Sequence, residues 1–153
     1  MLRDNPRATA SLAGLPIHSV LAPVPIVCFV GAFLTDIAYW RTAAMQWANF
    51  SAWLLTGGLV VSIFVVLAGL IDFFGDRRIR GLSSAWVHGL GNGLALILSI
   101  WNAFVHSRDA YTSVVPTGLI LSGVVVLILL VTGSIGARLV FHHRVGVRLE
   151  NGR

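Results

Sequence analysis

Residues 84–106 read SAWVHGLGNGLALILSIWNAFVH, a run without Asp, Glu, Lys or Arg. An α-helix rises about 1.5 Å per residue, so about 20 apolar residues cross the hydrocarbon core of a bilayer. The run is therefore predicted to be a transmembrane helix. Its polar and small residues recur at intervals of 4, 3, 4, 3 and 4, at His88, Asn92, Ala95, Ser99, Asn102 and His106. This spacing predicts one polar face along the whole span, turned toward other helices rather than toward lipid.

Three further apolar stretches complete the predicted membrane domain. They cover residues 17–39, 50–74 and 115–141. Hydrophobic residues make up 56% of the 153-residue chain and charged residues only 11%, against about 25% charged residues in soluble domains. The connections at 40–49, 75–83 and 107–114 are short, which places successive helices side by side in opposite directions. We therefore predict an all-α, integral membrane four-helix bundle with up-down-up-down topology, formed by residues 1–153 as a single domain.

The basic residues predict how this bundle lies in the membrane. All eleven are arginines, and nine of them lie in the two termini, in residues 75–83 or at the end of the fourth span. The nine are Arg3, Arg7, Arg77, Arg78, Arg80, Arg138, Arg144, Arg148 and Arg153. Only Arg41 and Arg108 lie on the other side, so both termini are predicted to be cytoplasmic. Arginines placed beside apolar segments are typical of membrane proteins, and no nucleic acid is expected as a partner.

Ionisable side chains gather at one end of the predicted bundle. His18 opens the first span, Asp72 closes the second, His88 lies one turn into the third, and His143 follows the fourth. With both termini in the cytoplasm, all four residues belong to the cytoplasmic end. Imidazole is a ligand of haem iron, and imidazole and carboxylate are both ligands of divalent metals. These four residues are the candidate haem- or metal-binding site.

Other polar residues on the inner faces accompany this candidate site. Asn92, Ser99 and Asn102 are the supporting polar residues along the third span. The first span repeats the spacing of the third and ends at Asp36, which is predicted to lie with His106 at the outer end. Tight packing with hydrogen bonds between helices explains these residues as well as ligand binding does.

Several short motifs follow one another in an order that is similar to a known family. They are Pro16 and His18 with Pro25-Ile26, then Asp36, Gly69 with Asp72, His88 with Asn92, and the tail Leu139 to Val147. In this order the chain resembles, from Gly14 to Val147, the bacterial membrane proteins catalogued as domain of unknown function 2231. The resemblance implies four helices in a bacterial inner membrane, a multi-pass location, and no particular chemistry.

Two positions depart from that family's usual pattern. Ser19 stands where the family has proline after the first histidine, and Arg144 stands where the family has the first glycine of the tail. The alignment of the tail favours His143 over His142 as the family histidine. Arginine resists the positive φ that glycine accepts, so a tail turn of that kind would be strained at Arg144.

The function predicted from these features is a non-catalytic membrane subunit or anchor, with lipid around it and another membrane or redox protein as partner. One alternative is a b-type haem protein for electron transfer, with His88 paired to His18 or His143 around a single haem. Another is a divalent-metal site formed by two or three imidazoles and Asp72. A third is a proton or small-solute relay along the stripe from His88 to His106. An independent hydrolase or kinase is not expected, because the sequence has no nucleophile–base pair, phosphate loop or paired carboxylates.

Overall fold

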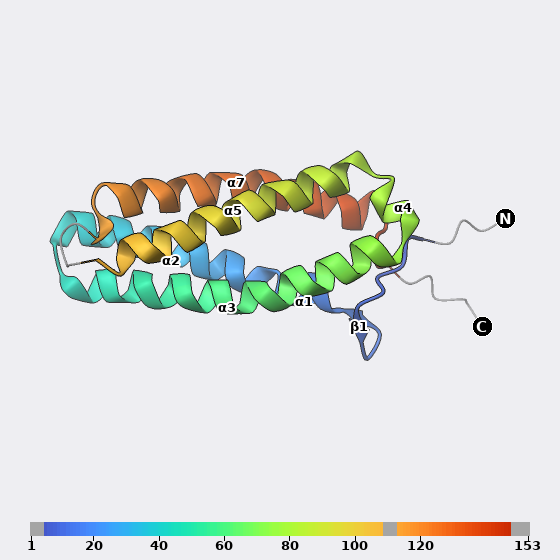
Figure 1. Cartoon of the computed structure of the whole chain (residues 1–153), viewed down its shortest axis with the longest axis horizontal. Coiled ribbons are helices and arrows are strands. Elements are labelled where there is room, and N and C mark those ends of the chain that lie inside the picture. Colours follow the sequence, from blue (N-terminus) through green and yellow to red (C-terminus); the bar gives the residue numbers. More distant parts are fainter. Residues whose placement is uncertain (1–4, 109–112, 148–153) are drawn as a thin grey trace.

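The structure is a computed structural model that describes residues 5–108 and 113–147. Short N-terminal elements precede long helices (Figure 1). In chain order the elements are β1 (Ser11–Leu12), β2 (Leu15–Pro16), α1 (Ile17–Leu21), α2 (Pro23–Thr42), α3 (Met45–Gly75), α4 (Arg77–Arg80), α5 (Ser83–His106) and α7 (Thr117–Phe141).

Four helical spans are long and apolar enough to cross a membrane, and Figure 1 shows successive spans running in opposite directions. They are Ile17–Thr42, Met45–Gly75, Ser83–His106 and Thr117–Phe141. The side-chain amide of Asn5 donates to the carbonyl oxygen of Val147 over 3.0 Å, so both ends of the described chain meet. We call that end of the bundle, which also holds residues 76–82, the terminal end. The opposite end, with the turn at residues 43–44, is the distal end. The predicted all-α membrane bundle is confirmed.

Two prolines divide the first span into α1 and α2. Pro23 and Pro25 have no N–H, so the carbonyl groups four residues before them lose their helical donors. Ala22, between the two helices, keeps right-handed helical angles of φ −54° and ψ −34°. Its N–H donates to the carbonyl oxygen of His18 over 2.9 Å. The chain therefore continues as one span through the interruption.

The first connection is much shorter than predicted. Residues 40–49 were expected as a loop, but α2 continues to Thr42 and α3 begins at Met45. Ala43 closes the turn with φ 54°, and its N–H donates to the carbonyl oxygen of Tyr39. The prediction was based on hydropathy, which falls where polar and interfacial side chains begin. Helical hydrogen bonding, however, continues beyond the apolar stretch.

The other predicted boundaries lie closer to the structure. The third and fourth spans begin at Ser83 and Thr117, within two residues of the predicted 84 and 115. The connection 75–83 contains the short helix α4, whose first turn is capped by Asp76 through a bond from the N–H of Arg78. Residues 109–112 of the predicted loop 107–114 lie outside the described residues.

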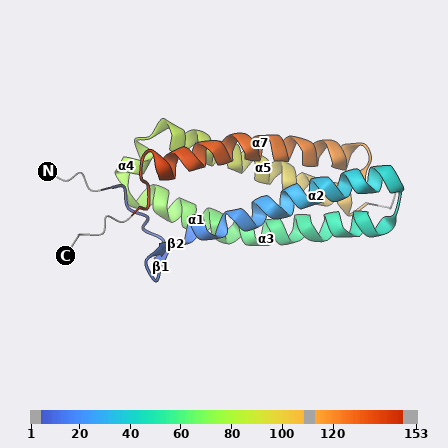
Figure 2. The same ribbon diagram turned by 180° about the vertical axis from the view of Figure 1, so that it is seen from behind.

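The spans pair as two hairpins, α1 and α2 with α3, and α5 with α7. Contacts within each hairpin are more extensive than those between hairpins, which run from α2 to α7 and from α3 to α5. Figure 2 shows α2 beside α7 toward the distal end, whereas α1 and α7 are separated toward the terminal end. The buried apolar core is formed by Phe29, Ala32, Leu55, Ala95, Val125 and Leu129. Large apolar side chains such as Trp53, which is 76% exposed, face outward, where lipid would cover them.

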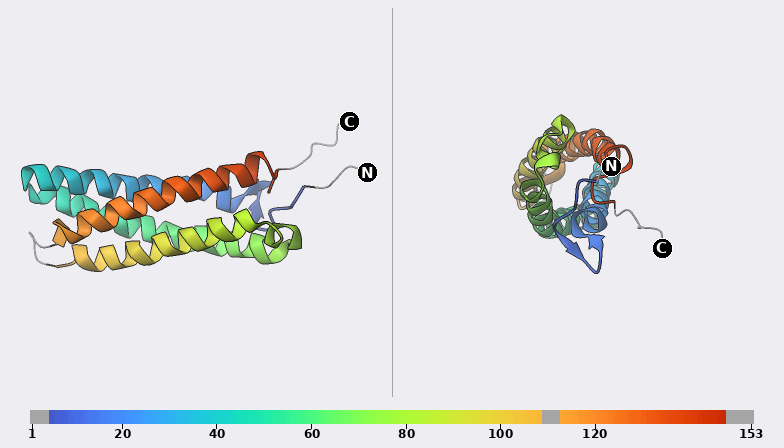
Figure 3. Two further views of the ribbon diagram at one scale, coloured as in Figure 1. Left: turned by 90° about the horizontal axis from the view of Figure 1, so that it is seen from above. Right: turned by 90° about the vertical axis from the view of Figure 1, so that its right-hand side faces the viewer.

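The N-terminal segment packs across the terminal end, which faces the viewer on the right of Figure 3. The backbone N–H of Ala10 donates to Asp72 Oδ1 over 2.7 Å, and that of Arg7 donates to Asp76 Oδ2 over 3.0 Å. The N–H of Ile17 donates to the carbonyl oxygen of Ala10 over 3.0 Å. Two carboxylates at the end of α3 thus hold the segment that leads into the first span.

The C-terminal tail joins the same surface. The N–H of Gly146 donates to the carbonyl oxygen of Pro6 over 2.9 Å. Gly146 has φ 76°, and Arg144 has φ 54° although it is not glycine. The tail turn therefore forms with arginine at this position, and tertiary contacts with the N-terminal segment outweigh the local strain.

Candidate functional site

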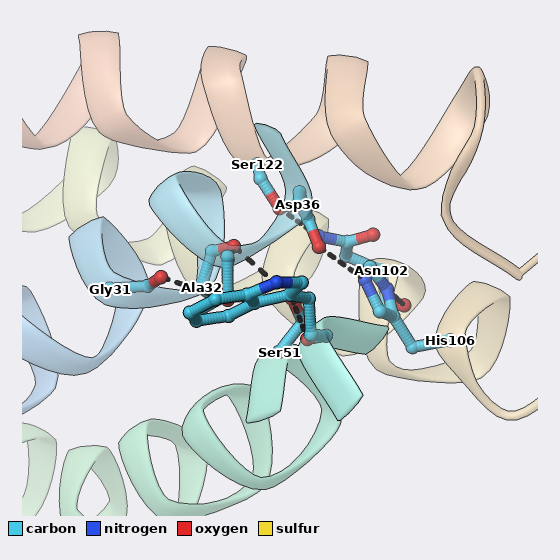
Figure 4. Close-up of polar contacts among 9 residues, drawn as sticks. Gly31, Ala32, Asp36, Ser51, Asn102, His106 and Ser122 are labelled. Atoms are coloured by element: carbon cyan, nitrogen blue, oxygen red, sulfur yellow. Dashed lines mark hydrogen bonds and ion pairs between the residues drawn. The ribbon is translucent and has the colours of Figure 1, made fainter. Parts of the chain in front are cut away.

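The most buried polar group lies at the distal end between α2, α5 and α7. His106 Nε2 is 2.9 Å from Asp36 Oδ1, and Ser122 Oγ donates to Asp36 Oδ2 over 2.6 Å. Asn102 Nδ2 donates to Ser122 Oγ over 2.7 Å. All four residues are buried, and Figure 4 shows their side chains converging on Asp36. We call Asp36, Asn102, His106 and Ser122 the distal cluster.

The hydrogen-bond partners assign most protons in the distal cluster. His106 Nδ1 lies 3.0 Å from the carbonyl oxygen of Asn102, and a carbonyl oxygen only accepts, so Nδ1 carries a hydrogen. One further proton lies between His106 Nε2 and Asp36 Oδ1. Whichever atom holds it, the pair has no net charge. Net neutrality suits this position, since a buried charge without a partner costs several kcal/mol.

The distal cluster holds the two hairpins together. Asp36 belongs to the first hairpin, while His106 and Ser122 belong to the second. Beside it, Thr35 Oγ1 and Ser51 Oγ lie 2.7 Å apart and join α2 to α3. Among the described residues, Asn102 Oδ1 is the buried side-chain atom without a hydrogen-bond partner. The structure places Asp36 and His106, the two polar residues predicted for one end, in direct contact.

At the terminal end, His18 and His88 face each other from α1 and α5. Their ring centres are 6.1 Å apart, and the ring planes form an angle of 76°. His18 Nδ1 lies 3.0 Å from the carbonyl oxygen of Val65, and His88 Nδ1 lies 2.9 Å from that of Thr132. Both imidazoles are half-buried. We call these two residues the histidine pair.

Both members of the histidine pair have the same tautomer when neutral. Because each Nδ1 faces a carbonyl oxygen, each Nδ1 donates, and the lone pair of each ring is left on Nε2. Among the described residues, His18 Nε2 has no hydrogen-bond partner. His88 Nε2 has only the amide of Asn92 at 3.5 Å, which is beyond ordinary hydrogen-bond length. Each ring therefore presents an uncommitted base.

Glycines on α3 and α7 make room for these rings. A Cβ atom at Gly69 would lie 2.9 Å from His18 Nδ1, and one at Gly136 would lie 2.8 Å from His88 Cε1. Either contact is closer than real Cβ atoms approach, so a larger residue would displace the imidazole. By contrast, a Cβ atom at Gly133, also on α7, would meet nothing within 4 Å.

The other residues predicted for this site have separate partners. Asp72 accepts the N–H of Ala10, and His143 lies against His142 with ring centres 5.0 Å apart. Of the four predicted ligands, the structure brings His18 and His88 into contact. Within residues 5–108 and 113–147, no three His, Cys, Asp or Glu side chains come together as a metal-binding group.

The supporting residues of the third span divide between the two ends. The side-chain amide of Asn92 donates to the carbonyl oxygen of His88 over 2.7 Å, next to the histidine pair. Ser99 donates to the carbonyl oxygen of Ala95 over 2.8 Å and is fully buried at mid-depth. Asn102 belongs to the distal cluster. The polar face of α5 therefore contributes to both the histidine pair and the distal cluster.

Sequence reasoning missed several residues that define these groups. Ser122 was not predicted as a partner of Asp36, and the close packing of the histidine rings against Gly69 and Gly136 was not predicted either. A signal for Ser122 exists, since it shares a face of α7 with Val125, Leu129 and Thr132, and all four are buried. The carbonyl groups that accept from the histidines carry no sequence signal, because every residue has one.

Outside the spans, Asp76 has a strongly lowered pKa. The hydrogen bond from the Arg78 guanidinium, assisted by backbone N–H groups of Arg7 and Arg78, holds the pKa of Asp76 well below its usual value of 3.8. Asp76 is thus ionised at neutral pH, which suits its role as acceptor for the N-terminal segment.

Comparison with known proteins agrees with a membrane protein. The model of a family described as predicted membrane protein (DUF2231) matches residues 14–149, nearly the whole chain. No curated protein and no solved structure matches the chain.

Proposed function

The chain belongs to the predicted membrane proteins of the DUF2231 family, and on this premise we propose that it is a non-catalytic membrane subunit that holds one metal-containing group between His18 and His88. The observation that carries the proposal is the orientation of the two imidazoles. Each donates from Nδ1 to a backbone carbonyl and leaves Nε2 free.

A backbone acceptor on Nδ1 is the usual outer partner of a metal-bound histidine. It sets the tautomer, orients the ring and increases the basicity of Nε2. Two such nitrogens cannot satisfy each other, because both are acceptors. A Lewis acid between them would remove this mismatch, because each Nε2 could then donate its lone pair.

We place the subunit in the bacterial inner membrane with both termini in the cytoplasm. Support comes from the six described arginines of the terminal end, against Arg41 and Arg108 near the distal end. Its partner is another membrane or redox protein. A periplasm-dependent reporter enzyme fused after Arg153 is expected to be inactive, and an active fusion would overturn this orientation.

Elemental analysis tests the proposed function. The protein, extracted from membranes in mild detergent, is analysed for iron, copper, zinc and manganese per chain. We expect about one equivalent of one metal, which falls at least tenfold in His18→Ala and in His88→Ala. His142→Ala is the matched control, because His142 is an exposed histidine near the same end, and it is expected to keep its metal.

A metal-free wild-type protein, or a metal content that both substitutions leave unchanged, would contradict the proposal. In that outcome the histidine pair is part of a purely structural polar core, as in a membrane anchor. Circular dichroism of each variant shows whether loss of metal accompanies loss of helix, and a variant that keeps its helix and loses the metal supports the proposal.

A further inference from the structure

The inner faces of the two hairpins share one spacing. His18, Ala22, Pro25, Phe29, Ala32 and Asp36 each have a counterpart exactly 70 positions later, at His88, Asn92, Ala95, Ser99, Asn102 and His106. The residues whose carbonyl groups accept from the histidine pair, and the glycines against which the rings pack, have a similar relation. Val65 and Gly69 on α3 correspond to Thr132 and Gly136 on α7, each 67 positions later. The bundle is therefore built from two similar halves.

The halves face each other around an approximate two-fold axis that runs along the bundle. His18 and His88 are equivalent residues and lie at the same end, as do Asp36 and His106. An object bound between equivalent residues lies near the axis and meets both halves in the same way. The histidine pair is thus a site for a ligand that offers two equivalent faces.

The two ends of the bundle differ in the hydrogen bonding of the residue pair found at each. At the distal end a carboxyl group and an imidazole share a proton directly over 2.9 Å, and nothing is needed between them. At the terminal end the two imidazoles come from the two halves, their ring centres lie 6.1 Å apart, and neither Nε2 has a described hydrogen-bond partner closer than 3.5 Å.

Resting on the proposed function, we infer that the group between His18 and His88 is a single haem b, with both imidazoles as axial ligands. The number of protein donors favours haem over a bare ion. A structural zinc site takes four protein ligands, but no group of three His, Cys, Asp or Glu exists in the described parts of the chain. A porphyrin supplies four nitrogens of its own, so two imidazoles complete six-coordinate iron.

The spacing of the rings agrees with shared coordination. A histidine nitrogen binds a first-row metal at about 2.0 Å, and the ring centre lies about 1.1 Å behind it, so two axial rings have centres about 6.2 Å apart. The observed separation is 6.1 Å. The angle of 76° between the ring planes is compatible, because an axial imidazole can turn about its bond to the metal.

Helix α1 packs mainly on α3, and its contacts with α5 and α7 are sparse. The six described arginines of the terminal end lie at the same end of the bundle as the histidine pair, and their positive charge would attract the carboxylates of a haem.

An absorption spectrum of the purified protein, oxidised and then reduced with dithionite, tests the inference. Cells are grown with a haem precursor, and apoprotein is also titrated with haemin. We expect one haem per chain with a low-spin, six-coordinate spectrum in both states. His18→Ala and His88→Ala are expected to lose at least tenfold in haem content, while His142→Ala keeps the wild-type spectrum.

A second variant guards against simple misfolding. In His88→Gly, added imidazole is expected to restore the low-spin spectrum, which a merely structural histidine would not allow. One equivalent of metal without haem, and no haemin uptake, would overturn this inference and leave the proposed function standing. Absence of both metal and haem binding would overturn both. Haem that binds equally well to the His18→Ala and His88→Ala variants would be adventitious and would also overturn the inference.

Discussion

Replacement of Asp36 is the most direct test of what the distal cluster contributes to stability. Asp36 accepts one hydrogen bond from Ser122 and shares a proton with His106, and its side chain is fully buried. In Asp36→Ala, the Ser122 hydroxyl and His106 Nε2 both lose their partner. Two interhelical hydrogen bonds in a membrane contribute about 1 kcal/mol together. Loss of one member of a buried ion pair costs about 3–5 kcal/mol.

We therefore expect Asp36→Ala to lower the free energy of unfolding by about 3 kcal/mol. Asp36→Asn is expected to cost about 1 kcal/mol or less, since an amide can reproduce both contacts. Its oxygen would accept from Ser122, and its NH₂ would donate to His106 Nε2, which is free to accept because Nδ1 carries the ring hydrogen. The contrast between the two variants isolates hydrogen bonding from charge.

The assay is equilibrium unfolding in mixed micelles with increasing dodecyl sulfate, followed by circular dichroism. Ser134→Ala is the control, because Ser134 lies exposed on α7 and bonds only to its own helix at Leu130. Addition of His106→Ala to Asp36→Ala is expected to cost far less than His106→Ala alone. The reasoning would be refuted if Asp36→Ala were no more harmful than Ser134→Ala, or if Asp36→Asn were as harmful as Asp36→Ala.

Three further outcomes are expected. Gly136→Ala should displace the His88 ring and reduce the bound metal or haem at least threefold. Gly133→Ala, on the same helix, should leave the bound metal or haem unchanged. Equal effects of the two substitutions would contradict the role of Gly136 in making room for His88. Arg144→Gly should raise the free energy of unfolding by about 0.5–1 kcal/mol, measured in the same micelles, because glycine adopts φ 54° without strain; a decrease would show that the arginine side chain stabilises the tail. Since the pKa of Asp76 is depressed in the folded protein, its stabilisation is complete above the ordinary value of 3.8 and is lost only as pH falls below it. After correction for intrinsic exchange, hydrogen exchange of residues 5–10 should accelerate below about pH 4 in the wild-type protein. In Asp76→Asn the exchange should already be fast at neutral pH and should show no such acceleration.

The helices were predictable because lipid imposes a simple rule on sequence. Each span must satisfy its own backbone and show apolar side chains outward, so hydropathy found all four spans. Helix ends were less predictable. Residues 45–49 are helical although they precede the predicted start at residue 50, because backbone hydrogen bonding does not stop where hydropathy falls.

The polar stripes were also visible in the sequence, but their partners were not. Spacing alone placed His88 and His106 on one face of α5, and Asp36 on the equivalent face of the first span. Which residues touch depends on the register and rotation of helices that are far apart in the sequence. That register made Asp36 a partner of His106, and it directed Asp72 to the backbone of Ala10 instead of to the histidines.

Residues 84–106 show which properties the sequence determined by itself and which only the tertiary structure decided. By itself it determined a membrane span with a polar face, since periodicity and apolar length are local properties of the chain. Only the tertiary structure decided that this face ends in a neutral, closed pair at His106 and in an open imidazole at His88. The physical reason is that a hydrogen bond needs a donor and an acceptor within about 3 Å, and helix packing alone brings Asp36 to one end of α5 and a second histidine to the other.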